Sequence, residues 1–364
     1  MRVRHGLCAL LLVASACSGD GGGSGAGAFQ RMLAASRAGA WRASGEDTVE
    51  VWVCKVPADT VVPVYGDLRL RADFTPPELV AAIAPRVIDY FRTVSHGRYM
   101  PSFVAGGEVT MSPTDEPADC AAAALDRSAP SGRAVLAVAD AEHAEDQPGG
   151  FGSGGTATTA MSAKENRRWA YVGANDFSAD WVDDPPMDLI EHELGHTLGW
   201  VHSGTDINPP IRYTSALDVM SDSAAPRNVD ASRRDGPDTI GVQRVVSGWL
   251  PANAVVVATG STTVQLEPST GDTGTRLVVV PLDDRSFLTV ELLTTDGFND
   301  HLPVAGLAVH RVTIGGDDLP ATIDPLNLGP QHTALLEQGG ALVTDGWAIS
   351  AAGGGRVTLR RAAG

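Results

Sequence analysis

Basic charge, cysteine and long apolar segments are all scarce in this chain. Lys and Arg number 27 against 44 Asp and Glu in 364 residues, which gives a formal net charge of −17. Such an acidic chain is not built to bind nucleic acid or anionic lipid, so we expect neither as a partner. Beyond the N-terminus no stretch is apolar enough to span a bilayer, and the cysteines number only four.

The N-terminus has the features of a secretory signal. Arg2 and Arg4 precede an apolar run at 7–13 that is too short for a stable membrane-spanning helix. The ending Ala-Ser-Ala-Cys resembles a bacterial lipoprotein box, which would make Cys17 a lipidated residue and the chain's one membrane anchor. Cleavage near Ala16 without lipidation, giving a free secreted protein, is the alternative. We therefore expect a signal peptide at 1–16, a lipidated cysteine with a Gly-rich linker at 17–47, and an extracytoplasmic location.

Residues 192–202 read HELGHTLGWVH and carry the strongest chemical signal. His192 and His196 are four residues apart, so on a helix both imidazoles can reach one metal ion. Gly199 lets the chain leave the helix and return His202 as a third ligand. Three imidazoles leave one tetrahedral position of Zn²⁺ open, as in a catalytic site, and Glu193 lies beside that position without being a ligand.

This pattern, HExxHxxGxxH, resembles the signature of the metzincin zinc peptidases. That resemblance implies a methionine turn beneath the metal, and Met220 in the segment SALDVMS lies at a suitable distance; a plain core methionine is the alternative. The astacin and serralysin groups place a tyrosine two residues after that methionine. Here the position is Asp222, which argues against both groups.

Flanking segments are similar to a narrower group, the gametolysin and immune inhibitor A peptidases. The similarity covers roughly 48–312, and the arginine that these families have after Glu291 is replaced by Leu292. Its segments are Ser203 directly after the third histidine, VQRVVSGWL at 242–250, SFLTVELLTTDGFNDHLPVAGLAVHRV at 286–312, and FRTVSHGRYMPSFVAGGEV at 91–109.

The resemblance implies a zinc endopeptidase that acts on protein or peptide substrates, with one catalytic Zn²⁺ and Glu193 as the general base. We expect a monomer. Two other functions stay open at this point. One is a surface binding or adhesion lipoprotein whose zinc domain is vestigial, and the other is a zinc hydrolase that cleaves non-peptide amides.

The order of local patterns predicts an α+β fold with two domains. Residues 48–250 are expected to form a metzincin-like catalytic domain, with a mixed twisted sheet and the active-site helix, and 251–364 a β-sandwich-like domain. Asp184 is expected to cap the active-site helix, with Pro185 at its first position. Residues 169–175 read as a strand, either a sheet edge that pairs with an extended substrate or an ordinary edge.

Two of the cysteines, Cys54 and Cys120, remain in the mature domain. Outside the cytoplasm such a pair usually forms a disulfide, which we expect here. The rival idea, that Cys54 binds the zinc as an inhibitory switch, lacks the usual surrounding motif. Acidic residues Glu142, Glu145 and Asp146 could bind Ca²⁺, but without EF-hand-like spacing solvated loops are the better interpretation.

Overall fold

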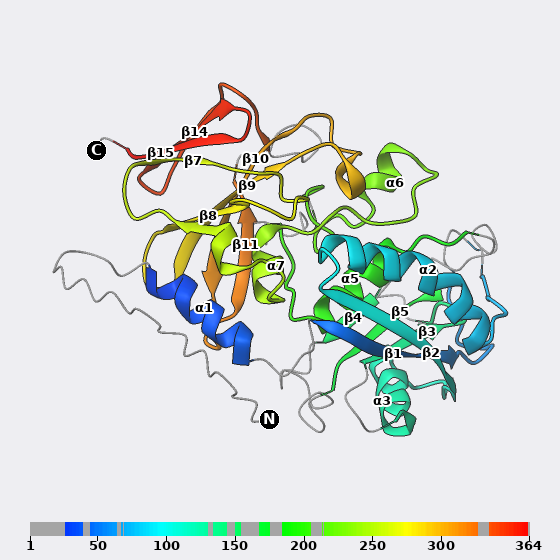
Figure 1. The fold of residues 1–364 in the computed structure, drawn as a ribbon. Coiled ribbons are helices and arrows are strands. Elements are labelled where there is room, and N and C mark those ends of the chain that lie inside the picture. Colours follow the sequence, from blue (N-terminus) through cyan, green and yellow to red (C-terminus); the bar gives the residue numbers. More distant parts are fainter. Residues whose placement is uncertain are drawn as a thin grey trace, which may run out of the picture.

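The computed structural model describes residues 26–38, 44–63, 67, 69–129, 134–143, 150–153, 167–174, 184–204, 213, 215–326 and 335–362. These residues form an α+β protein with three sheets and few helices (Figure 1). The fold class expected from the sequence is therefore correct at this level. None of the described helices combines the length and the apolar character needed to cross a membrane.

The first sheet has five strands and lies in the part of the chain that contains the histidine motif. Four of its strands are parallel, and the last, at one edge, is antiparallel to its neighbour. All six residues of the central strand are buried, as its continuous apolar sequence predicts. The strands, in spatial order, are β2 (Tyr99–Thr110), β1 (Gly45–Lys55), β3 (Ala134–Ala139), β5 (Trp169–Val172) and β4 (Gly150–Ser153).

Helices cover both faces of this sheet. α2 (Pro76–Val94) and α5 (Asp188–Thr197) share one hydrophobic core with one face of the strands, and α3 (Pro117–Arg127) packs on the other face. α2 begins in a capping box, in which the carboxylate of Glu78 accepts hydrogen bonds from the backbone N–H of Thr75 (2.8 Å) and from its hydroxyl (2.7 Å). Because α5 lies against β4 and β5, its motif residues are fixed by the sheet.

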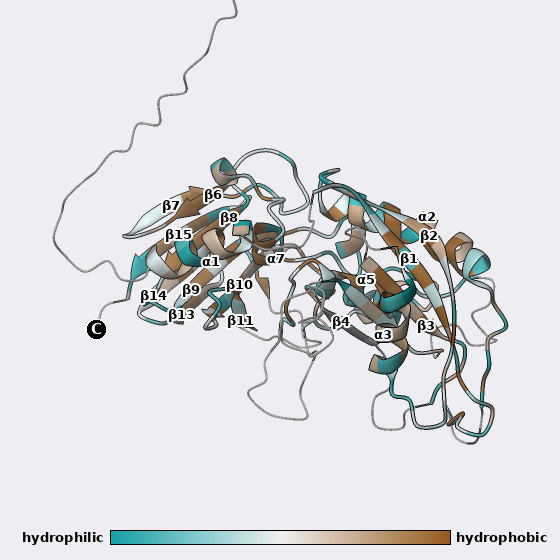
Figure 2. Ribbon diagram, turned by 90° about the horizontal axis from the view of Figure 1, so that it is seen from below, coloured by the Kyte–Doolittle hydropathy of each residue, from teal (hydrophilic) through white to brown (hydrophobic). Residues whose placement is uncertain are grey.

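The C-terminal part of the chain forms two further sheets that pack on one core. In Figure 2 their strands carry many hydrophobic residues, coloured brown. Val278, Leu288 and Val309 from the first of these sheets meet Trp347 and Leu359 from the second. The first contains β11 (Pro320–Pro325), β10 (Gly306–Ile314), β9 (Ser286–Leu293), β8 (Leu277–Pro281) and β6 (Val255–Val257), with β12 (Leu335–Leu336) beside β10. The second contains β13 (Ala341–Thr344), β14 (Trp347–Gly353), β15 (Arg356–Arg361) and β7 (Thr262–Gln265).

A shared core joins the histidine-containing part to the C-terminal sheets. Trp200 and Trp249 belong to the same buried cluster as Phe287 of β9, Val312 of β10 and Ile323 of β11. Two short helices, α6 (Ala225–Val229) and α7 (Gly241–Val246), and two 3₁₀ turns, at Ala252–Ala254 and Gly297–Asn299, complete the described elements. The C-terminal sheet that contains β9, β10 and β11 is therefore packed against the region of the site.

The interpretation of 17–47 as a linker is wrong for part of that range, because Ala26–Ala38 is a helix, α1. Ala28 and Met32 are fully buried, and the ring of Phe29 packs edge-on against Phe287 at 5.5 Å. Arg31 forms an ion pair with Asp318 (2.9 Å). Apolar residues at 28, 29 and 32 share one helix face, a pattern that the neighbouring glycine-rich composition concealed.

The expected start of the active-site helix is also wrong. α5 begins at Asp188, with Met187 as its N-cap, so Asp184 does not cap it. Pro186 disfavours helical backbone at Pro185, which delays the helix until both prolines have passed. The carboxylate of Asp184 instead pairs with Arg86 (2.9 Å) and Arg234 (3.2 Å).

The prediction that residues 169–175 form an edge strand is wrong by one strand. Trp169–Val172 (β5) is an interior strand between β3 and β4, and its four residues are all buried. The strand at that edge is β4, in the glycine-rich stretch that the sequence pattern left without a structure. Short glycine-rich strands lack the alternation of apolar residues by which strands are recognised.

Candidate metal centre

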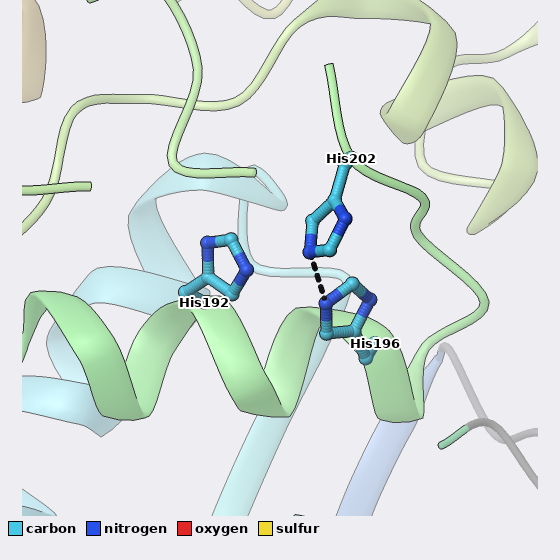
Figure 3. A group of neighbouring side chains, drawn as sticks. All are labelled: His192, His196 and His202. Carbon is cyan, nitrogen blue, oxygen red and sulfur yellow. Dashed lines mark hydrogen bonds between the residues drawn. The ribbon is translucent and has the colours of Figure 1, made fainter. Parts of the chain in front are cut away.

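Three histidines from α5 and the segment after it meet in one group (Figure 3). One ring nitrogen of each lies within 4.8 Å of the others, and the Nε2 atoms of His196 and His202 are 3.0 Å apart. His192 is buried, His196 half-buried and His202 exposed, so the group opens to solvent on one side. Among the described residues no other group of three or more such side chains could hold a metal ion.

Gly199 produces the turn that brings the third histidine back. Its φ is +79°, in the left-handed region that favours glycine. The backbone N–H of Gly199 donates to the carbonyl of His196 (3.0 Å), and that of Trp200 donates to Gly195 (3.2 Å), which closes the helix. The chain then reverses, and His202 faces the two histidines on the helix.

Backbone carbonyls fix the orientation of the two helical histidines. Nδ1 of His192 lies 2.7 Å from the carbonyl oxygen of Val219, and Nδ1 of His196 lies 2.9 Å from that of Trp200. Carbonyl oxygens only accept hydrogen bonds, so each Nδ1 carries the proton and each Nε2 offers its lone pair. In this tautomer the lone pair of each Nε2 can bind a metal ion.

Met220 is fully buried against α5, the helix that carries His192 and His196. A Cβ atom added to Gly195 on α5 would lie 2.6 Å from Sδ of Met220, so helix and methionine are in close contact. The carbonyl of Met220 accepts a hydrogen bond from the backbone N–H of Ser203 (3.0 Å), directly after His202. Val219 and Met220 thus tie two of the three histidine positions to one turn of backbone.

Glu193 is buried beside the group, with 3% of its surface exposed, and its Oε2 has no hydrogen-bond partner among the described residues. Burial raises the pKa of its carboxyl group well above the usual value. A Cβ added to Gly150 in β4 would lie 2.5 Å from Cγ of Glu193. The edge strand therefore lies directly on the carboxylate.

Burial also keeps the helical histidines neutral. Burial, and to a lesser extent the neighbouring histidines, lowers the pKa of His192 well below 6.5 and that of His196 to about 4. Neutral imidazole is the form that binds metal ions. The described chain therefore presents neutral nitrogen donors at neutral pH.

Several residues around the site had no signal in the sequence. Tyr213 follows His202 by eleven residues, and its hydroxyl lies 3.4 Å from Nε2 of that histidine. The side-chain amide of Gln243 on α7 donates to the carbonyl of Val201 (2.6 Å). Asp218 accepts hydrogen bonds from the hydroxyls of Ser203 and Thr239. These contacts depend on how the chain folds, and residue spacing alone does not reveal them.

None of the other candidate residues that the structure describes belongs to this group. Cys54 of β1 and Cys120 of α3, 66 positions apart in sequence, form a disulfide, so Cys54 is not a metal ligand here. Cys17, Glu145 and Asp146 lie outside the described residues. Glu142 is described and buried, and it belongs to no group of metal-ligating side chains in that part of the chain.

Comparisons with known proteins add little to this geometry. No model of a protein family matches the chain. No curated protein matches it either. Among solved structures, one described as "Structure of a chaperone-substrate complex" aligns with a TM-score of 0.25 and 10% sequence identity. That alignment covers 56% of this chain and 35% of the other, about a third of its length.

Proposed function

We propose that this chain is a zinc-dependent metalloendopeptidase of the metzincin type, related to the gametolysin and immune inhibitor A group. The observation that carries the proposal is the convergence of His192, His196 and His202, with Glu193 buried beside them. The motif predicts these roles from sequence, and the side chains of the folded chain are compatible with them.

The donor set suits Zn²⁺. Three imidazole nitrogens within 4.8 Å of one another, two of them oriented by backbone carbonyls, form an open nitrogen site. No carboxylate or thiolate belongs to the group among the described residues, which argues against Ca²⁺ or Mg²⁺ as the resident ion. When bound, Zn²⁺ supplies Lewis acidity and lowers the pKa of water toward about 7.

In the proposed hydrolysis the residues of the chain position the metal-binding histidines and transfer a proton. Glu193 accepts a proton from the attacking water and passes it to the leaving amine. Its Oε2, with no hydrogen-bond partner among the described residues, is available for that proton. The turn at Val219 and Met220 holds the histidines, so the site does not need to reorganise during the reaction.

Strand β4 offers a place for the substrate backbone. It is the edge of its sheet and lies against Glu193 and His196 on α5. An extended peptide can pair with such an edge through main-chain hydrogen bonds, whatever its side chains. An endopeptidase needs this kind of sequence-independent binding next to the reacting groups.

The proposed location is extracytoplasmic, with attachment through a lipid at Cys17 or free secretion. The Cys54–Cys120 disulfide is typical of oxidising compartments and supports this proposal. Labelling of intact cells with a lipid precursor, compared between the natural chain and Cys17→Ala, distinguishes the two forms of attachment.

Metal content and hydrolysis of a mixed peptide library test the function. Residues 26–364 of the natural chain, of Glu193→Ala and of His202→Ala would be purified and loaded with zinc. We expect about one zinc per chain and cleavage from the natural chain, zinc without cleavage from Glu193→Ala, and loss of both from His202→Ala.

Other outcomes point elsewhere. Hydrolysis by metal-replete Glu193→Ala would contradict the role given to this carboxylate. Zinc binding without cleavage of any peptide would favour a binding function or a non-peptide amide as substrate. No zinc at all would remove the basis of the proposal.

A further inference from the structure

His202 differs from the other two histidines of the group because it does not lie on a helix. α5 ends at Thr197, and the segment 199–204 contains no further helix or strand. The His202 imidazole is also exposed, whereas that of His192 is buried. The place of the third ligand nitrogen therefore depends on the contacts that hold the backbone beside it.

The residues directly after His202 are held by backbone contacts to two distant segments. The N–H of Ser203 donates to the carbonyl of Met220 (3.0 Å), and the N–H of Gly204 donates to that of Ile323 in β11 (2.9 Å). Ser203 and Ile323 also form a parallel bridge. Strand β11 of the C-terminal sheet thus contributes to the site through the backbone that carries the third histidine.

Asp218 adds a side chain to these contacts. It is fully buried, and its carboxylate accepts hydrogen bonds from the hydroxyls of Ser203 and Thr239, the latter at 3.1 Å. The backbone N–H groups of Met220 and Ile240 also face it and favour its charged form. A buried charge needs such donors, and the charge in turn holds each donor in place. The carboxylate therefore connects the segment after the third histidine with the turn at Met220 and with the start of α7.

Asp218 also begins the tight turn that orients His192. The backbone N–H of Ser221 donates to the carbonyl of Asp218 (2.9 Å), and inside this turn the N–H of Met220 faces the Asp218 carboxylate. The carbonyl of the same peptide group, that of Val219, accepts the hydrogen bond from Nδ1 of His192 (2.7 Å). Because a peptide group is planar, a contact at its N–H also fixes the direction of its carbonyl.

We propose that Asp218 is a positioning residue for two of the three metal-binding histidines. Through the Val219 carbonyl it directs the ring of His192. Through the Ser203 hydroxyl it holds the backbone next to His202. The proposal rests on the metal centre of the proposed function and adds a residue that acts on this centre through others. Asp218 does not belong to the group that could hold the ion, and its full burial keeps it away from a substrate.

Zinc affinity of the folded, metal-free chain, measured by competition with a chelating dye, tests this role. Asp218→Ala removes the acceptor of all these bonds and should raise the Kd for zinc by about tenfold to a hundredfold. Asp218→Asn keeps one carbonyl oxygen as an acceptor, so it should restore part of the affinity. Asp140→Ala is the matched control, because this buried carboxylate accepts from the N–H of Val56 (2.9 Å) and pairs with Arg71 (2.7 Å) instead. It should leave the Kd unaltered.

Ser203→Ala removes one hydroxyl and leaves the carboxylate in place, so it tests the same role if Asp218→Ala does not fold. It should also weaken zinc binding, by a smaller factor. Asp218→Ala/Ser203→Ala should bind zinc about as weakly as Asp218→Ala alone, because both changes remove the same hydrogen bond. The visible absorption of the Co²⁺-loaded chain, which depends on the ligand geometry, should change in Asp218→Ala and Ser203→Ala and not in Asp140→Ala.

These measurements separate the positioning role from the peptidase function, since none of them needs hydrolysis. Unaltered zinc affinity and Co²⁺ absorption in the folded Asp218 and Ser203 variants would overturn the role and leave the peptidase function intact. An equal loss of affinity in Asp140→Ala would also overturn it, because any buried carboxylate would then have the same effect. Weaker zinc binding in the Asp218 variants, together with no cleavage by the natural chain, supports the role and contradicts the peptidase function. A natural chain that binds no zinc overturns both.

Discussion

Gly152 of β4 lies directly against His196 of α5: a Cβ atom added to Gly152 would lie 2.6 Å from Cβ of His196 and 2.4 Å from the carbonyl oxygen of Glu193. Both distances are shorter than non-bonded carbon and oxygen atoms tolerate, and one of the two atoms belongs to the backbone. The edge strand can therefore approach the motif helix only because this residue is glycine.

Gly152→Ala should displace β4 from α5 and disturb His196. We expect a loss of about 1–3 kcal/mol in the free energy of unfolding, as for other overpacked sites, and weaker zinc binding. Denaturant unfolding and zinc titration measure the two effects. Gly260→Ala, where nothing lies within 4 Å of the added Cβ, is the matched control and should change neither. An unchanged Gly152→Ala protein would show that β4 is not packed as closely as described.

Met220 should be needed for packing against α5. Its side chain is fully buried against Gly195, so Met220→Ala leaves a cavity and should cost about 2–5 kcal/mol of unfolding free energy. Met220→Leu nearly conserves the volume and should cost less than about 1.5 kcal/mol. Thermal unfolding of the metal-free proteins measures both. Equal stability of the two variants would contradict a packing role for this side chain.

The sequence predicted the geometry of the histidine motif better than it predicted the residues that surround the motif. The spacing of His192, His196 and His202 correctly predicts that they meet, because helix periodicity and one glycine turn determine their geometry. The carbonyls of Val219 and Trp200 that orient the rings could not be predicted, since every residue has a carbonyl and only the fold selects these two.

Fold elements with strong periodicity were predicted, and those without it were missed. Apolar Leu79, Ile83 and Val87 recur at helical spacing and lie in α2 (Pro76–Val94), and the continuous apolar run at 134–139 is the buried strand β3. Strand β4 could not be predicted from the sequence because two of its four residues are glycine. Strand β11 was missed because it begins and ends with proline. The contribution of β11 to the site depends on long-range packing, which no local pattern encodes.

The disulfide should stabilise the chain without being needed by the site. Cys54 and Cys120 are separated by 66 residues, so loop-closure entropy predicts a contribution of about 4 kcal/mol. It links β1 to α3 on the sheet face opposite α5. Reduction should therefore lower the free energy of unfolding and leave the zinc affinity of the folded protein nearly unchanged. Cys54→Ala/Cys120→Ala serves as control and should not respond to reductant; a parallel loss of zinc affinity would contradict this separation.

His310 of β10 should make the fold sensitive to acid. The ring is fully buried, neither of its nitrogens has a hydrogen-bond partner among the described residues, and burial lowers its pKa to about 4. An unfolded histidine has a pKa of about 6.5, so below that pH the unfolded chain binds a proton that the folded chain does not. The free energy of unfolding therefore has its full value above about pH 6.5 and decreases as the pH is lowered toward 4. His310 accounts for about 3 kcal/mol of this decrease.

His310→Leu should remove that acid sensitivity. Leucine also leaves no unpaired polar atom, so we expect the variant to be at least as stable as the natural chain at pH 7.5 and more stable by about 3 kcal/mol at pH 4. Denaturant unfolding of both proteins at several pH values between 4 and 7.5 measures this, and the difference between them cancels the other groups that titrate in the range. A difference in unfolding free energy that stays constant with pH would mean that His310 is protonated equally in the folded and unfolded chains.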